Sequence, residues 1–332
     1  MFFMGGSPLI LTAQKVEEIK KLYQDPAKFS TDIANITGVK HRTVKKALCY
    51  LHKKGLPYIP RIGKHKTFVN TELELFSENE YRREREKIYG LFDDGRAKKI
   101  IGGGDMHCPF HDEKAVRKSI EEGGDIYVVG ADTLDCYSIS HFRKDKIIRL
   151  QDEIVDGLYL LDLISKKFKY VVVLEGNHEK RLIKILHNRF EDKPDLIKRF
   201  EQSAHLLSDM GKVFKNVHVI NNFWCKIGQT IFAHPDWYSV VPGKTVLNTY
   251  EYMIKDGQEF DCIVNFHTHR LAKMCSWRKL LIEAPALSHR MDYTRDGKKF
   301  KGEWAKGFAI INQDKQGRTD YGKTELRFLG WG

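Results

Sequence analysis

The sequence lacks a long hydrophobic run and a paired cysteine motif. No stretch approaches the roughly 20 consecutive apolar residues that a membrane-spanning helix needs. The chain starts with an apolar segment, MFFMGGSPLILTA, and its first basic residue, Lys15, comes after this segment. A secretion signal has basic residues before its apolar region, so we do not expect one here. The six cysteines are scattered and form no CxxC pair, as expected for reduced thiols. We therefore expect a cytoplasmic protein without disulfide bonds.

Acidic residues are scarce at the start of the chain. The net charge of the 332 residues is +12. Residues 1–66 hold 13 Lys or Arg and four acidic residues, a net charge of +9, which leaves +3 for the remaining 266 residues. A small, strongly basic segment favours a polyanionic partner. A surface that only keeps the chain soluble is the alternative, and charge alone does not exclude it.

Residues 12–52 have the apolar spacing of three short helices. The first covers 12–23. The second starts at Ser30 as a predicted N-cap, has an apolar stripe of Ile33 and Ile36, and ends at Gly38. The third, HRTVKKALCYLHKK, places Val44, Leu48 and Leu51 on its inner face.

The last two of these helices resemble a helix-turn-helix, in which the second helix enters a DNA major groove. Its outward cations, which would neutralise DNA phosphates, are Arg42, Lys45 and Lys46. Three-helix units of this kind also dock other proteins, so the pattern leaves both roles open. Arg61, Lys64 and Lys66 extend the basic patch or belong to a solvated linker.

A charged linker separates this basic unit from the rest of the chain. Residues 77–98 mix both signs of charge, have few apolar residues and end near a DDG turn, which predicts an exposed connecting helix. We therefore predict a helix-turn-helix-like domain over residues 1–66, a linker over 67–97 and a large α/β domain over 98–332.

In the large domain, short apolar runs typical of strands alternate with helical stretches at 112–122, 145–168, 179–210 and 244–257. Each of five strand-like runs ends in a polar residue that can bind metal. They are Asp105 and His107; Asp132 and Asp135; Asn177, His178 and Glu179; His234; and His267 and His269. Since ligand sites of α/β sheets lie beyond the carboxyl ends of the strands, we expect these side chains to converge.

The residue types suit a site for two metal ions that hydrolyses a phosphoester. Such a site combines oxygen donors and imidazoles, and one carboxylate bridges both ions. No cysteine joins the set, which argues against a structural zinc site. Manganese is the expected metal, with iron, zinc, nickel or magnesium as alternatives.

The order DMH, GADTLD, GNHE, AHPD and HTH resembles the calcineurin-like metallophosphoesterase family, whose pattern is D-x-H, G-D-x-x-D, G-N-H-D/E, H and G-H-x-H. The motifs span residues 105–269, and their wording looks like that of phage- or mobile-element-encoded members, which would place the protein in a host cytoplasm. The resemblance implies an αββα sandwich of two mixed β-sheets flanked by helices. The runs KLLIEAPALS, GFAIINQD and KTELRFL would supply the second sheet.

The resemblance also implies a role for each site residue. Asp105, His107 and His269 would hold one metal ion, Asn177, His234 and His267 the second, and Asp132 would bridge both. A hydroxide between the ions would attack phosphorus. His178 would be the catalytic histidine near the leaving oxygen, and Asp135 would orient His178 or a metal ligand. His111 and His141 could touch substrate, although a surface position is expected for each.

Three residues depart from the family pattern. Ala131 and Phe266 replace glycines, and Pro235 stands where glycine is frequent. Glycine allows positive φ and close backbone approach, so the departures affect the loops that carry the ligands. Phe266 is the largest change and could tilt the turn that carries His267.

The resemblance does not specify a substrate, because one fold hosts many functions. A basic unit tethered to a phosphoesterase would concentrate DNA phosphodiesters near the site. We therefore expect a nuclease or phosphodiesterase that acts on DNA. The alternatives are a phosphomonoesterase acting on a phosphoprotein or nucleotide, and a DNA-binding regulator whose metal site is weak or structural.

Overall fold

The computed structural model describes residues 2–4, 7–9, 12–25, 30–53, 94–141, 144–191, 193, 195–197, 205–291 and 304–332. The chain divides into two compact units, Met1–Glu78 and Asn79–Gly332. Most of the predicted linker, as well as Arg61, Lys64 and Lys66, lies outside the described residues. None of the described helices is both long and apolar enough to cross a membrane.

The smaller unit contains a short hairpin, β1 (Phe2–Met4) and β2 (Ser7–Leu9), and three helices, α1 (Ala13–Tyr23), α2 (Ser30–Thr37) and α3 (His41–Lys53). The helices share one apolar core, made of Ile19, Tyr23, Ile33, Ala34, Val44, Ala47 and Leu48. Gly38 links α2 to α3 with a φ of 65°, as its predicted role at a turn requires.

Two details of α2 differ from the prediction. Ser30 is the first residue of α2 rather than its N-cap. Its Oγ lies 2.9 Å from Nε2 of His41 in α3, so the Ser30 hydroxyl group contacts α3 instead of capping the backbone of α2. Ile36 is 52% exposed instead of buried, because the buried face of α2 runs along Ile33, Ala34 and Thr37 and leaves Ile36 beyond its edge.

The larger unit contains two β-sheets. The first has six strands in the order β13-β12-β3-β4-β5-β6. Their bounds are β3 Lys98–Gly103, β4 Ile126–Val129, β5 Tyr170–Leu174, β6 Val217–Ile220, β12 Ala305–Gln313 and β13 Glu325–Trp331. The second has five strands in the order β10-β11-β9-β8-β7. Their bounds are β7 Trp224–Ile227, β8 Thr230–Ala233, β9 Cys262–Asn265, β10 Ala272–Ser276 and β11 Lys279–Glu283.

Both sheets are mixed. Strands β3 to β6 run parallel, as do β8, β9 and β11, whereas β12, β13, β7 and β10 pair antiparallel with their neighbours. The prediction that the last three apolar runs build the second sheet is therefore correct only for the run that contains β11. Strand β12 pairs with β3 and so belongs to the first sheet. Its buried side chains alternate between the helical layer and the interface of the two sheets.

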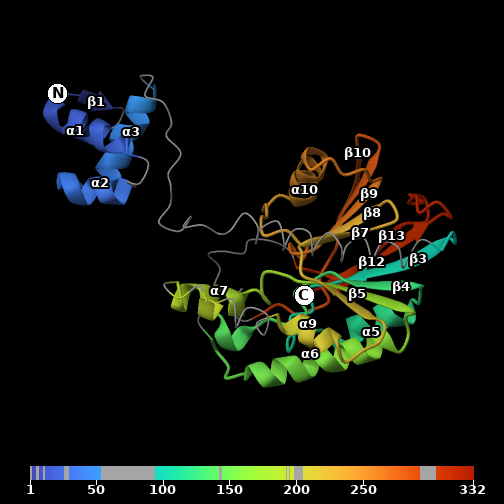
Figure 1. Cartoon of the computed structure of the whole chain (residues 1–332). Helices are drawn as coiled ribbons and strands as arrows, with labels where there is room; N and C mark the ends of the chain where they lie inside the picture. The colour runs from blue at the N-terminus through green and yellow to red at the C-terminus, as the bar shows by residue number, and fades with distance from the viewer. Residues whose placement is uncertain are drawn as a thin grey trace. The chain divides into compact units, whose positions relative to one another are not determined.

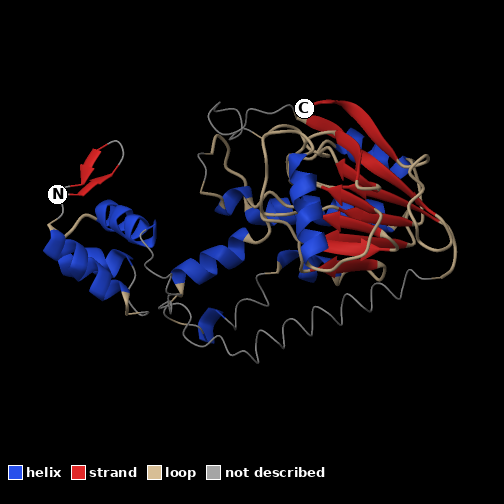
Figure 2. Cartoon of the chain, turned by 90° about the horizontal axis from the view of Figure 1, so that it is seen from above, coloured by secondary structure: helices blue, strands red, loops and turns tan. Residues whose placement is uncertain are grey.

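Helices cover the outer face of each sheet, as Figure 1 shows. Helices α5 (Glu113–Glu121) and α6 (Leu150–Ser165) pack on the first sheet, and α10 (Lys244–Lys255) packs on the second. A third apolar cluster, which includes Val128, Phe232 and Val264, joins the two sheets. The strands, which Figure 2 shows in red from above, thus form one block between helices on its two faces, and the predicted αββα sandwich is confirmed.

Two predicted helices are shorter than expected. Residues 145–149 precede α6 instead of belonging to it: the amides of Asp145 and Lys146 donate to Tyr137 Oη, and the Ile147 side chain is fully exposed. The stretch 179–210 is not a single helix, since α7 (Arg181–Arg189) ends before Phe190 and α9 (Leu206–Gly211) starts later. The sequence of this stretch includes Pro194, and proline disfavours the interior of a helix.

Candidate metal centre

The predicted ligands lie in loops at the carboxyl ends of five strands. Asp105 and His107 follow β3, Asp132 follows β4, Asn177 follows β5, His234 follows β8, and His267 and His269 follow β9. Asp105, His107, Asp132 and His234 are almost completely buried, and His269 is 6% exposed. The sandwich therefore gathers at one edge the polar residues that the sequence separates by more than 160 positions.

The donor atoms converge in overlapping groups. The groups are Asp105, His107 and His269; His107, Asp132 and His178; and Asp132, His234 and His267, with the donor atoms of each group within 4.8 Å of one another. Asp132 belongs to the second and third groups and His107 to the first and second, so the three groups are continuous. Asp132 Oδ2 lies 3.2 Å from His234 Nε2 and 3.9 Å from His107 Nε2, so this carboxylate lies between the two outer groups. This is the arrangement expected of a carboxylate shared by two neighbouring cations.

The distances between donors fit the spacing of ligands around a metal ion. His107 Nε2 lies 3.2 Å from His269 Nε2, and His234 Nε2 lies 3.2 Å from both Asp105 Oδ1 and Asp132 Oδ2. Two ligands that are each about 2.1 Å from an ion lie roughly 3.0–3.4 Å apart. The donor set is therefore already at coordination spacing.

Asn177 supplies a further oxygen donor. Its Oδ1 is buried and has no hydrogen-bond partner among the residues that the structure describes. A buried amide oxygen without a partner is costly unless a cation or water molecule takes its lone pairs. This orphaned oxygen, together with the imidazole and carboxylate donors, makes the site chemically suited to divalent metal ions.

The backbone that carries the ligands is strained. Asp105, His107, Asp132, His267 and His269 all have φ between 45° and 85°, which is the left-handed region. This conformation costs a residue with a side chain ~1–2 kcal/mol, and such residues cluster at functional sites. Five strained positions within one set of loops indicate that the fold holds the donor atoms at the expense of local backbone preference.

Ala131 and Phe266 are accommodated differently. Ala131 has a φ of 70°, so its methyl group remains in a conformation that favours glycine. Phe266 is completely buried between the sheets, where its ring fills the space that Gly104 and Gly130 leave open. A Cβ atom on Gly130 would lie 2.3 Å from this ring. The ring thus points into the core rather than into the site.

Asp105 fixes the turn that follows Phe266. Its Oδ2 accepts a 2.9 Å hydrogen bond from the His267 amide, while its Oδ1 faces His234 and His269. On the other side of the site, Asp132 Oδ1 accepts from the His178 amide, and a Cβ atom on Gly176 would lie 2.0 Å from that oxygen. Both carboxylates therefore use one oxygen to position a loop and direct the other toward the centre.

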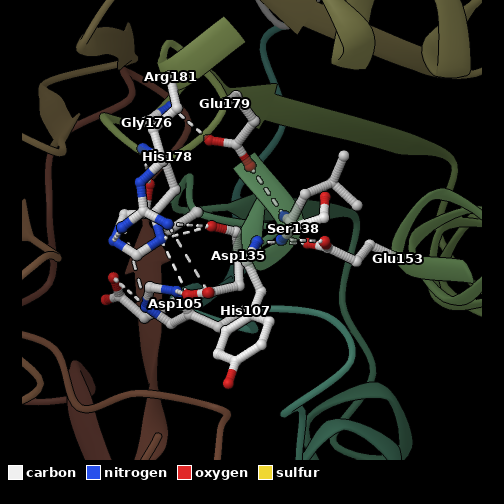
Figure 3. Close-up of polar contacts among 12 residues, drawn as sticks. Asp105, His107, Asp135, Ser138, Glu153, Gly176, His178, Glu179 and Arg181 are labelled. Carbon is white, nitrogen blue, oxygen red and sulfur yellow. Dashed lines mark hydrogen bonds and ion pairs between the residues drawn. The ribbon is translucent and has the colours of Figure 1, made fainter. Parts of the chain in front are cut away.

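Asp135 orients two histidines, as Figure 3 shows. Its Oδ1 lies 3.1 Å from His107 Nδ1 and 3.0 Å from His178 Nδ1. Because these contacts take the Nδ1 atoms, Nε2 of His107 is the nitrogen left to face the metal centre. A carboxylate behind a metal-binding histidine sets its tautomer and orientation. The predicted positioning role of Asp135 thus applies to both rings.

Arg181 lies next to His178, which the sequence reasoning missed. Its Nη2 donates to His178 Nε2 at 3.1 Å, and its Nη1 donates to Asp135 O at 2.5 Å (Figure 3). His178 Nε2 in turn lies 3.8 Å from Asp132 Oδ2, so the guanidinium contacts a histidine that lies beside a candidate metal ligand. The three-residue spacing in GNHEKR, which brings both side chains to one side of a helical turn, was the available signal.

The electrostatics of the site favour positive charge at its centre. Burial would raise the pKa of Asp105 and Asp132, but nearby histidines outweigh it and hold the pKa of both carboxyls below the ordinary value. Burial opposes a charged His234, yet Asp132 and Asp105 raise its pKa well above normal. Burial, with the neighbouring His234, lowers the pKa of His267 to about 3. The carboxylates stay ionised, and a neutral imidazole is available as a ligand.

Glu179 ties two of the ligand loops together. It is completely buried, and it accepts hydrogen bonds from the Leu134 and Gly176 amides at 2.9 and 3.0 Å. Burial and the nearby Asp132 raise its pKa to about 8. The sequence placed Glu179 among the polar residues at the strand ends, and the structure gives it this bracing position rather than one among the donors.

Other predicted residues lie apart from the centre. His141 is exposed and His111 is half-buried beside its bridge to Ser288, and neither belongs to the three donor groups. In the smaller unit, Arg42 is exposed on α3, whereas the side chains of Lys45 and Lys46 lie outside the described part of the structure.

Comparison with known proteins gives only distant similarities. No family model and no curated protein matches the chain. Solved structures that resemble it include a novel archaeal phosphodiesterase (12% identity, 70% of this chain and 98% of that chain, TM-score 0.35). They also include zinc-complexed Vps29 from Entamoeba histolytica (9%, 70% and 98%, 0.33) and a predicted phosphoesterase from Streptococcus pneumoniae (11%, 70% and 98%, 0.29). TM-scores this far below 0.5 do not establish a shared activity.

Proposed function

We propose that the protein is a metal-dependent phosphodiesterase that acts on DNA. The observation that carries the proposal is the position of Asp132 among the buried donors, since its Oδ2 lies 3.2 Å from His234 Nε2 and 3.9 Å from His107 Nε2, one imidazole from each proposed ligand set. Asp105, His107 and His269 would hold one divalent ion, and Asn177, His234 and His267 a second, with Asp132 shared between them. Such ions supply Lewis acidity and a hydroxide nucleophile at neutral pH.

His178 and Arg181 would contact the phosphate group of the substrate. Arg181 is permanently charged and carries planar donors that match phosphate oxygens. It donates to His178 Nε2. A phosphoryl oxygen is the stronger acceptor, so we expect Arg181 to turn toward it and to free His178 Nε2. Burial opposes a charged His178, but Asp132 and Asp135 raise its pKa, so the freed Nε2 can take up a proton from solvent and donate it to the leaving oxygen.

The basic unit supports DNA as the substrate. Arg42 is exposed on α3, and residues 1–66 carry a net charge of +9. Cations on this unit, with Arg42, Lys45 and Lys46 as the proposed contacts, would hold a DNA backbone and raise the concentration of phosphodiesters near the metal centre.

The test is hydrolysis with Mn²⁺ of labelled single- and double-stranded DNA, bis-p-nitrophenyl phosphate and p-nitrophenyl phosphate. His178→Ala and Arg181→Gln are run beside the unmodified protein. We expect hydrolysis of DNA and of the diester, with a large loss in both variants. Cleavage of the monoester alone would instead indicate a phosphomonoesterase. Inactivity on all substrates with DNA still bound would indicate a regulator.

A further inference from the structure

An exposed tyrosine lies beside the proposed metal centre. The ring of Tyr238 is 6.1 Å, centroid to centroid, from the ring of His267, and its side chain is 61% exposed. His267 in turn packs edge-on against His234 at 4.8 Å. Tyr238 is therefore an aromatic surface next to two donors of one metal group, and none of the roles proposed above uses it.

The loop that presents Tyr238 is held from several directions. Arg270 Nη1 donates to Ser239 O at 2.5 Å, and the Ser239 amide donates to Thr245 Oγ1 at 2.9 Å. On the other side of Tyr238, Trp237 packs against Phe223 and Tyr252, each with ring centroids 5.5 Å apart. The anchors on both sides keep the Tyr238 ring in solvent although the adjacent Trp237 turns inward.

The same loop carries other exposed apolar side chains. Val240 is 62% exposed and Val241 is 58% exposed. These two side chains are exposed on the same loop as Tyr238 but carry no aromatic ring, so they offer matched positions at which to test whether a ring is needed.

We infer that Tyr238 is a stacking platform for the nucleobase next to the phosphate that the metal centre binds. In a nucleotide only the sugar separates the base from its phosphate, and Tyr238 is likewise the immediate neighbour of a proposed metal ligand. Bases stack on aromatic side chains without regard to sequence, whereas bases within a duplex are already stacked on each other. The inference rests on the proposed function and specifies single-stranded or unpaired nucleic acid as the substrate class.

The test compares two competitive inhibitors of bis-p-nitrophenyl phosphate hydrolysis. Inorganic phosphate reports on the metal centre alone, and deoxyadenosine 5′- or 3′-monophosphate adds a base. We expect at least one of the monophosphates to bind more tightly than phosphate. Tyr238→Ala should raise the inhibition constant of that monophosphate by roughly 5- to 100-fold and leave that of phosphate unchanged.

Two further variants separate stacking from other causes. Tyr238→Phe keeps the ring and loses the hydroxyl group, so it should retain the preference for the nucleotide. Val241→Ala alters the same loop without removing an aromatic ring and should behave like the unmodified protein. If Tyr238→Ala changes the inhibition constants of phosphate and of the monophosphate equally, or changes neither, the stacking role of Tyr238 is wrong while the proposed function stands. Absence of diester hydrolysis by the unmodified protein overturns the proposed function, and the platform with it.

Discussion

The two units of the chain use their polar residues in opposite ways. In the larger unit, the functional candidates are buried at the ends of strands and are held by strained loops. In the smaller unit, the one proposed contact whose side chain the structure describes, Arg42, is exposed on a helix around an ordinary apolar core. A metal centre needs donor atoms at fixed spacing, whereas binding to a phosphate backbone needs mainly positive charge. Substitutions should therefore affect one unit sharply and the other gradually.

The largest effect is expected for Asp132→Asn. This change removes the charge that links two donor groups, so diester hydrolysis with Mn²⁺ should fall at least 10²- to 10³-fold. DNA binding by the basic unit should persist in an equilibrium titration. Asp209→Asn, which alters an exposed ion pair with Lys212, is the matched control and should keep full activity. Retained hydrolysis in Asp132→Asn would show that the donor groups do not act together.

Asp135→Asn should have a smaller effect on the same unit. The amide still fits between His107 and His178, but it no longer favours the tautomers that the carboxylate sets. Removal of such a partner typically costs about 10- to 100-fold in metal affinity or activity. Isothermal titration of the metal-free protein with Mn²⁺ measures this directly. Unchanged affinity would limit Asp135 to a role toward His178.

Combined substitution of Arg42, Lys45 and Lys46 by Ala should leave the metal centre unaffected. Each cation that neutralises a phosphate adds about one unit to the slope of log K against log salt concentration, so the slope should decrease by up to about three. Fluorescence anisotropy with labelled DNA over a range of salt concentrations gives this slope. The control replaces three exposed lysines of the larger unit, Lys166, Lys212 and Lys323. Equal loss in both variants would contradict a specific role for α3.

The smallest effect is expected for Ala131→Gly. Ala131 has a φ of 70°, where glycine is unstrained, so the substitution should stabilise the larger unit by about 0.5–1 kcal/mol. Ala309→Gly, in the buried strand β12, should instead destabilise it by a similar amount. Urea unfolding measures both changes. Destabilisation by both substitutions would mean that the Ala131 methyl group contributes packing that outweighs the strain.

The sequence was most informative about features that depend on neighbouring residues in the chain, such as a strand and the polar residue that follows it. Alternating strand-like runs and the polar residues that follow them predicted an α/β domain with its candidate donors at one edge, because strand ends share one edge of a sheet. The sandwich of two sheets was implied only by the resemblance of the motif order. The exact helix limits were less predictable. Residues 145–149 have helical spacing but precede α6, and the amides of Asp145 and Lys146 contact Tyr137 Oη. That contact depends on a turn that the apolar pattern does not encode.

The sequence by itself determined which donors this protein has and the order in which they occur. Only the tertiary structure decided which donors meet, since His107 and His269 are 162 positions apart and lie 3.2 Å from each other. It also decided that Asp135 serves two histidines, that Arg181 contacts His178, and that Phe266 fills the space beside Gly130. The physical reason is that side-chain identity is a property of each residue, whereas spacing between donors arises from the packing of two sheets whose contacts are far apart in the chain.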